Sequence, residues 1–113
     1  MSESDIDVAL IRRWFDGMDA SEGIGEALYL AISQMTPSVN VDLIIKSPNG
    51  CSTLLTWRDD QYYGPGWHIP GGVIRFKEKM IDRVHKVAKR EFNRGLATVE
   101  GPIGFQEMFN TTR

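Results

Sequence analysis

The segment Trp67–Gly72 constrains the fold of this chain more than any other feature. A short, largely apolar stretch runs into a glycine pair, Gly71–Gly72, and Glu78 follows six residues after the second glycine. Residues 78–93 then carry apolar side chains at helical spacing and place Glu91 thirteen residues beyond Glu78. This order predicts a strand, a tight glycine turn, and a helix that presents a carboxylate near its end.

Length and composition limit the classes of protein that fit. A chain of 113 residues suffices for one compact domain and is too short for two. With 42% hydrophobic and 25% charged residues, it matches a soluble globular protein. No apolar run approaches the ~20 residues of a membrane span, so we expect no membrane partner. A single cysteine, Cys51, and an acidic start without a secretory signal favour the cytoplasm.

Charge is distributed unevenly along the chain. The net charge of −2 is not the strong positive charge typical of a nucleic-acid-binding protein, so nucleic acid is not an expected partner. Residues 1–26 hold seven acidic and two basic side chains, whereas residues 75–94 hold eight basic and three acidic ones. Two interpretations stay open. The basic stretch is either a solvated helix face attracted to the acidic end of the chain, or a field that favours an anionic ligand such as a diphosphate.

The order of helices and strands predicts an α/β (α+β) fold. Residues 1–36 should form a helical extension of two helices, the first capped by Ser4 and the second by Ser21. Residues 37–113 should form a single compact unit. Within it we expect a hairpin over residues 40–57, a polar loop over 58–66, a short strand over 67–70, the helix over 78–93, and one or two strands over 96–109.

The glycine pair and the two glutamates match part of a longer pattern, G-x5-E-x7-R-E-U-x-E-E-x-G-U, in which U is a bulky aliphatic residue. Gly72, Glu78 and Glu91 stand in the right places. Other positions differ: Lys86 replaces arginine, Val87 and Arg90 replace two glutamates, Ala88 stands at the aliphatic position, and Asn93 replaces the second glycine. The segment resembles the Nudix box, a loop and helix that hold a metal ion against a diphosphate.

The differences bear on the metal. Positions 87, 90 and 91 lie three and four residues apart, so they share one helix face, where three carboxylates of the intact pattern can hold Mg2+. Because only Glu91 of the three remains, and Arg90 brings a positive charge beside it, a cluster of several metal ions is not expected.

Three further stretches narrow the resemblance, namely Thr36–Ile44, Leu54–Arg58 and Gly64–Gly72. Together they look like the GDP-mannose mannosyl hydrolase branch of the Nudix family, over residues 36–108. The resemblance implies a Nudix-like mixed sheet with the box helix packed on it. It also implies cleavage of a sugar–phosphate bond with a single Mg2+, or with Mn2+ in its place.

The resemblance carries over to particular residues. It implies that the Gly71 carbonyl and the Glu91 carboxylate would bind the metal, while Gly72 and Glu78 would shape the box. It also implies a diphosphate contact for Arg58.

Other substrate contacts are expected around these residues. The resemblance implies that Asp42 would lie near the substrate. Arg75 is a second candidate for binding phosphate, although the branch has its arginine two positions earlier, where this chain has Val73. Tyr63 and Trp67 could stack on a base or sugar, or simply pack in a loop or core.

The catalytic base is the least defined part. The branch uses a histidine well beyond the box, together with a further metal ligand from the same region, and this sequence ends at Arg113. We therefore expect the C-terminal part of the fold to be missing. His68 and Glu107 are the candidates within the chain, against the simpler alternatives of a packed histidine and a surface carboxylate.

Three functions follow as alternatives. The first is a Mg2+-dependent hydrolase of a nucleoside diphosphate linked to another group, most naturally a nucleotide sugar. The second is a non-catalytic module that binds a nucleotide or a protein. The third is an obligate homodimer, in which a second subunit completes the sheet and the N-terminal helices form the interface.

Overall fold

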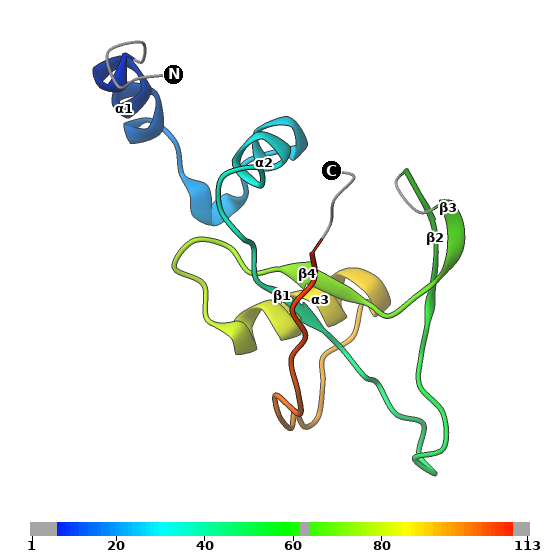
Figure 1. Ribbon diagram of the computed structural model, residues 1–113. Helices are drawn as coiled ribbons and strands as arrows, with labels where there is room; N and C mark the ends of the chain where they lie inside the picture. Colours follow the sequence, from blue (N-terminus) through cyan, green and yellow to red (C-terminus); the bar gives the residue numbers. More distant parts are fainter. Residues whose placement is uncertain (1–6, 62–63, 110–113) are drawn as a thin grey trace.

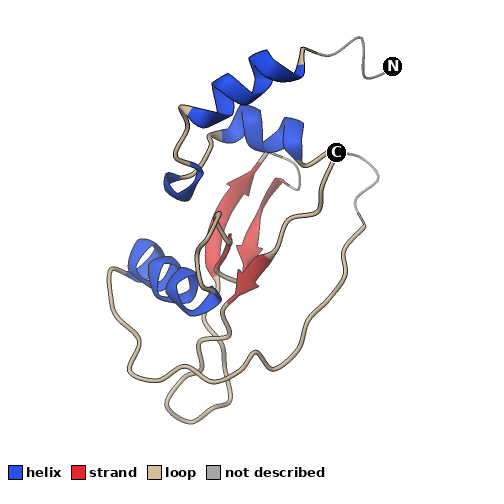
Figure 2. Ribbon diagram, turned by 90° about the vertical axis from the view of Figure 1, so that its left-hand side faces the viewer, coloured by secondary structure: helices blue, strands red, loops and turns tan. Residues whose placement is uncertain are grey.

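The computed structural model describes residues 7–61 and 64–109, and these residues form an α+β fold (Figures 1 and 2). The N-terminal helices precede four strands, and the longest helix follows the last strand, which agrees with the predicted α+β class. The elements are α1 (Val8–Asp16), the short 3-10 helix η2 (Ala20–Glu22), α2 (Glu26–Ile32), β1 (Asn40–Asp42), β2 (Thr56–Asp60), β3 (Gly64–His68), β4 (Gly71–Val73) and α3 (Met80–Phe92).

The strands form two antiparallel pairs rather than one mixed sheet. β1 pairs with β4, with Val41 opposite Gly72, and β2 pairs with β3, with Arg58 opposite Gly66. The prediction of a mixed sheet is therefore wrong for the described residues. Buried Pro70 lies between β3 and β4 and has no N–H to continue a ladder, and its carbonyl accepts from the backbone N–H of Leu43 at 2.8 Å.

The hydrophobic core lies between the β1–β4 pair and α3. Val41 and Leu43 contribute from one side, and Val87 and Ala88 of α3 are fully buried on the other. Gly72 lets the two layers approach, because a Cβ atom there would lie only 3.0 Å from Val87 Cγ2. This contact fixes the last turns of α3 against β4 and so determines where residues 90 and 91 stand.

Helix α3 confirms the predicted helix over residues 78–93 to within two residues at its start and one at its end. It ends at Asn93, which adopts the left-handed conformation (φ 54°) and donates its N–H to the Lys89 carbonyl at 2.9 Å. Asp82 in the first turn, and Lys89 and Arg90 in the last, complement the helix dipole.

The N-terminal helices form, although with different caps. Asp7 caps α1, because its carboxylate accepts from the Leu10 N–H at 2.9 Å, while Ser4 lies outside the described residues. The second predicted helix is divided into η2 and α2. Asp19 rather than Ser21 caps η2, and Gly25 before α2 takes a positive φ (80°) that breaks the helical path.

The predicted hairpin over residues 40–57 is confirmed only around its turn. Lys46 pairs with Thr53 there, and the Leu54 N–H donates to the Ile45 carbonyl at 3.0 Å. Farther out the two arms separate, because β1 buries its apolar residues under α3 by pairing with β4. The second arm continues into β2, so the predicted polar loop over 58–66 is wrong in its described part.

Two other predictions about the backbone are wrong. Gly71 and Gly72 lie in strand β4 and not in a turn, and neither has a positive φ. Residues 96–109 form no strand, because within the described part of the chain they find no ladder partner. Their side chains are largely exposed, and Phe105 is 93% exposed.

The molecule is elongated. Its radius of gyration is 17.4 Å, compared with about 13 Å for a compact domain of this length. Figure 1 shows the reason, since α1 and α2 lead away from the body that β1, β4 and α3 form. No helix within residues 7–61 or 64–109 is both long and apolar enough to cross a membrane.

Candidate functional site

Four residues predicted to form the site come together in one place. An open hollow with a volume of about 430 Å3 is lined by residues of β1, β2, β4 and α3. We call it the central hollow. The predicted residues in its lining are Asp42, Arg58, Gly71 and Glu91, accompanied by Gly72 of the box. The rest of the lining is Asn40, Ile69, Val73 and Arg90.

Close backbone contact gives the central hollow its floor. A Cβ atom at Gly71 would lie 2.6 Å from the Val41 carbonyl oxygen and would also overlap the Asp42 carboxylate. No side chain fits there, so the strand pair can form in this register only with glycine. The glycines predicted as a turn are instead required for the approach of β4 to β1 and to α3.

One guanidinium joins the two groups that were expected to bind a metal. Arg90 Nη2 donates to the Gly71 carbonyl oxygen at 2.7 Å and to Glu91 Oε1 at 2.9 Å. Arg90 Nε donates to the same carboxylate oxygen at 3.2 Å. The Gly71 carbonyl and the Glu91 carboxylate therefore lie together, as the resemblance implies. The cation between them is the Arg90 guanidinium.

The residues as arranged do not fit a divalent ion at this position. Mg2+ requires several oxygen ligands, and it would have to displace Arg90 from both oxygens. Across residues 7–61 and 64–109, no group of three or more His, Cys, Asp and Glu side chains is placed to hold a metal. The Mg2+ requirement therefore remains a prediction from the resemblance.

Two other charged groups of the central hollow are available to a ligand. Arg58 and Asp42 are both exposed, and neither side chain has a hydrogen bond or ion pair with another described residue. Arginine presents planar donors that match phosphate oxygens. A carboxylate can accept a proton, or hydrogen bonds from sugar hydroxyl groups. The hollow thus offers both a cation for a diphosphate and an acceptor.

Glu78 joins the loop after β4 to α3. Its carboxylate accepts from Arg83 Nε at 2.6 Å, from Arg83 Nη2 at 2.8 Å, from Lys86 Nζ at 3.0 Å and from the Arg75 backbone N–H at 3.2 Å. The side chains of Glu78 and Arg83 are only 7% and 6% exposed. The bond from Arg83 is the largest influence on Glu78 and, with Lys86, lowers the pKa of Glu78 to about 2 despite the opposing effect of burial.

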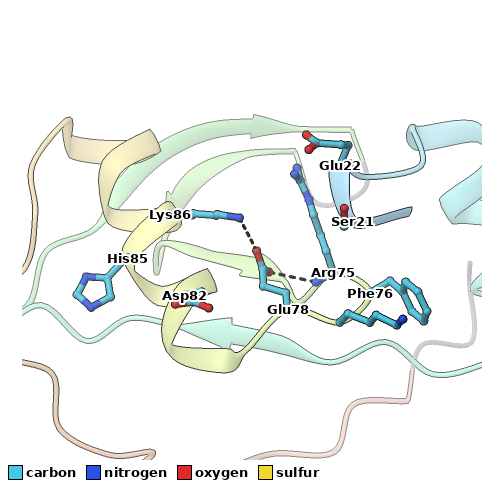
Figure 3. A pocket seen from close by; sticks show the side chains of 9 residues that line it. Ser21, Glu22, Arg75, Phe76, Glu78, Asp82, His85 and Lys86 are labelled. Carbon is cyan, nitrogen blue, oxygen red and sulfur yellow. Dashed lines mark hydrogen bonds and ion pairs between the residues drawn. The ribbon is translucent and has the colours of Figure 1, made fainter. Parts of the chain in front are cut away.

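Glu78 also borders a second hollow, with a volume of about 530 Å3, which we call the loop hollow (Figure 3). Arg75 and Lys86 line it, together with Ser21 and Glu22 of η2. The guanidinium of Arg75 extends toward η2, where a Cβ atom at Gly23 would lie 3.4 Å from Arg75 Cζ. The structure therefore does not bring Arg75 to the central hollow.

The predicted aromatic contacts also lie elsewhere. Trp67 packs edge-on against Trp57, with ring centroids 5.3 Å apart. The two residues are direct partners in the β2–β3 pair, and side chains alternate between faces, so they lie opposite the face that carries Arg58. Tyr63 falls outside the described residues.

Neither candidate base lines the central hollow. His68 is partly buried, and its Nε2 atom is buried without a hydrogen-bond partner in the described part of the chain. Glu107 lies exposed in the segment that follows α3, and it lines neither hollow. Their predicted catalytic roles gain no support from this arrangement.

Sequence reasoning did not anticipate the roles of Arg83 and Arg90. Both lie on the face of α3 that carries Val87, four residues after Arg83 and three before Arg90. Val87 is buried against Gly72 of β4. Arg83 and Arg90, on the same face, therefore lie close to Glu78 and Gly71. The helical spacing of Arg83, Val87 and Arg90 was sufficient to predict that these residues share one face. The box pattern indicates only that two glutamates are absent.

Comparison with known proteins gives one similar sequence. The chain is 33% identical over 82 residues to the low-salt glycan biosynthesis protein Agl8 of Haloferax volcanii, a stretch that covers 73% of this chain and 51% of that protein. The chain therefore spans about half the length of this curated relative. No model of a protein family matches the chain, and no solved structure does.

Proposed function

We propose that this chain is a Nudix-like hydrolase domain that acts on a nucleotide sugar, with the diphosphate held in the central hollow. The observation that carries the proposal is the convergence of Asp42, Arg58, Gly71 and Glu91, four residues from four elements that the family resemblance assigns to one site. These residues are far apart in the sequence but line the same hollow, as a single ligand-binding site requires.

The similar protein supports the same class of substrate. Agl8 is named for glycan biosynthesis, and glycan assembly draws on sugars activated as nucleotide diphosphates. A domain related to such a protein would meet nucleotide sugars as substrates or ligands. The name alone indicates neither the sugar nor the bond that is cut.

The resemblance implies hydrolysis at the sugar carbon, and the residues of the central hollow can be given roles in it. Water attacks that carbon, the bond from carbon to the bridging phosphate oxygen breaks, and the nucleoside diphosphate leaves with added negative charge. Arg58 donates to the phosphate oxygens and stabilises that charge, which is worth most in a site organised before the reaction. Asp42 accepts the proton of the attacking water, because it is the carboxylate of the central hollow without a protein partner in the described chain.

A screen for turnover tests the proposal. Nucleotide sugars, dinucleotides and nucleoside triphosphates are incubated with the protein, with and without Mg2+, and released sugar is separated from phosphate products. We expect free sugar and nucleoside diphosphate. Arg58→Gln should lower kcat/KM by roughly a hundredfold, because the charge on the leaving group loses a cationic donor.

The matched control is Arg94→Gln, which removes an exposed arginine from outside the lining of both hollows and should leave kcat/KM unchanged. Equal losses in the two variants would contradict a specific role for Arg58. Release of nucleoside monophosphate would show that the pyrophosphate bond is cut instead.

The contact of Arg90 favours a second candidate function, a module that binds a nucleotide sugar without cleaving it. Arg90 occupies the oxygens that would hold a catalytic metal, and neither His68 nor Glu107 reaches the central hollow. Saturable binding without turnover, from folded protein, would select this alternative.

We also propose that the chain forms a homodimer through α1. The apolar side chains of this helix are exposed although they follow a helical period: Val8, Leu10, Ile11, Trp14 and Phe15. Such a patch on a helix is typical of an interaction surface. Sedimentation equilibrium should give twice the 12.8 kDa chain mass, and a monomer at all concentrations would contradict the proposal.

A further inference from the structure

The position of Arg90 extends the proposed function. Its guanidinium lies between the Gly71 carbonyl and the Glu91 carboxylate, with donor–acceptor distances of 2.7 and 2.9 Å for the shared Nη2 atom. We propose that Arg90 is the built-in cation of the central hollow and binds the diphosphate of the ligand directly, so that binding does not require a divalent metal. This inference rests on the proposed function, because it assumes a ligand with a diphosphate.

The free part of the guanidinium is suited to that contact. Nε and Nη2 are used by Glu91 and Gly71, whereas Nη1 has no hydrogen bond with the described residues. The side chain of Arg90 is 52% exposed, compared with 23% for Glu91. The ion pair therefore holds the arginine in place on its protein side and leaves donors accessible from the hollow, where they can engage phosphate oxygens.

Electrostatics makes Arg90 and a divalent ion alternatives at these two oxygens. An ion bound to both would sit within a few ångströms of the guanidinium charge, and the repulsion would be large in a partly buried position. Binding the ion would also break the three hydrogen bonds that hold Arg90. Removing the guanidinium should therefore expose a weak metal site that the unmodified protein does not offer.

Arg90 would not act alone on the ligand. Arg58 lines the same hollow from β2 and carries no partner in the described chain. Two arginines from different elements give the hollow two positive charges, against the carboxylates of Asp42 and Glu91. The two positive and two negative side chains give the hollow no net charge. A bound diphosphate adds negative charge, so both arginines would be needed to bind it.

Isothermal titration of GDP-mannose as a probe tests the inference, with excess EDTA in one series and Mg2+ in the other. The unmodified protein should bind with the same Kd in both, within about twofold. Arg90→Met keeps the length of the side chain but removes the charge, and it should weaken binding in EDTA by roughly tenfold or more. Mg2+ should restore part of the affinity of this variant only.

Lys89→Met is the matched control, because it removes a neighbouring positive charge that lines neither hollow. It should bind as the unmodified protein does. Thermal unfolding of each variant shows that the fold is intact before binding is compared.

The outcomes separate the two levels of the proposal. Binding that needs Mg2+ in the unmodified protein, with Arg90→Met equal or tighter, overturns the inference about Arg90 and leaves nucleotide-sugar binding standing. No binding to the folded protein in either series, with UDP-glucose as a second probe, overturns the proposed function and the inference with it. An equal loss of affinity in Lys89→Met and Arg90→Met overturns the specific role of Arg90. It would mean that binding depends on the net charge of the protein and not on a contact with Arg90.

Discussion

Replacing Gly71 with alanine is expected to lower the free energy of unfolding by about 3 kcal/mol or more. The added methyl group would meet the Val41 carbonyl oxygen at 2.6 Å and the Asp42 carboxylate, and the first of these is backbone that cannot rotate away. Separation of β1 from β4 would relieve the clash, but it would open the core between these strands and α3. Urea unfolding followed by circular dichroism measures the loss.

Gly72→Ala provides the matched comparison. Its methyl group would meet Val87 Cγ2 at 3.0 Å, a side-chain atom with some room to move, so a smaller loss of about 1–2 kcal/mol is expected. Combining it with Val87→Ala should remove the clash, and the double variant should lose less than the sum of the two single variants. An unchanged urea midpoint for Gly71→Ala would show that the strands do not pair in this register.

Replacing Glu78 with glutamine should lower the thermal midpoint by roughly 5–10 °C at neutral pH. The substitution leaves the buried guanidinium of Arg83 without its charged partner and weakens the hydrogen bonds that join the loop to α3. Thermal unfolding at neutral pH gives the size of the effect. Glu107→Gln, at an exposed position outside both hollows, is the control and should have little effect.

The effect of Glu78 should depend on pH in a defined direction. Its folded-state pKa is about 2, below the ordinary value of 4.5, so the folded protein holds the ionised form more strongly than the unfolded chain does. The stability that this carboxylate contributes is therefore fully present above pH 4.5 and is lost as the pH falls toward 2. The difference in thermal midpoint between Glu78→Gln and the unmodified protein should shrink over that interval. A constant difference would mean that Glu78 acts through shape and not through charge.

The sequence predicted the elements that depend on local patterns. Helix α3 follows from apolar residues at helical spacing; either Asn93 or Gly95 fitted its end, and the structure ends the helix at Asn93 in a left-handed conformation. The family resemblance assigned Gly71, Glu91, Asp42 and Arg58 to one site, and the structure brings these four residues together in the central hollow. These features depend on short segments or on a motif with fixed spacing.

The partners of the strands could not be predicted in the same way. Residues 40–57 read as a hairpin, because a turn with Pro48, Asn49 and Gly50 stands between two extended stretches. The structure keeps that turn and pairs β1 with β4 instead, since only this pairing buries Val41 and Leu43 under α3. Such a choice depends on long-range burial, which a local pattern does not contain.

The charge partners on α3 were accessible in principle. Arg83, Val87 and Arg90 share one helix face, and Val87 is its fully buried apolar residue. Once Val87 is placed against Gly72, the arginines on either side must approach Glu78 and Gly71. What the spacing could not supply is the rotamer that takes Arg90 to the Gly71 carbonyl rather than into solvent.

The most direct test of the central claim is to map where a nucleotide sugar binds. Backbone amide resonances of the labelled protein are followed by NMR during titration with GDP-mannose. We predict the largest shifts at Asn40, Asp42, Gly71, Gly72 and Glu91, around the central hollow. Shifts confined to Arg75, Lys77 and Lys86 would place the ligand in the loop hollow instead and would contradict the account.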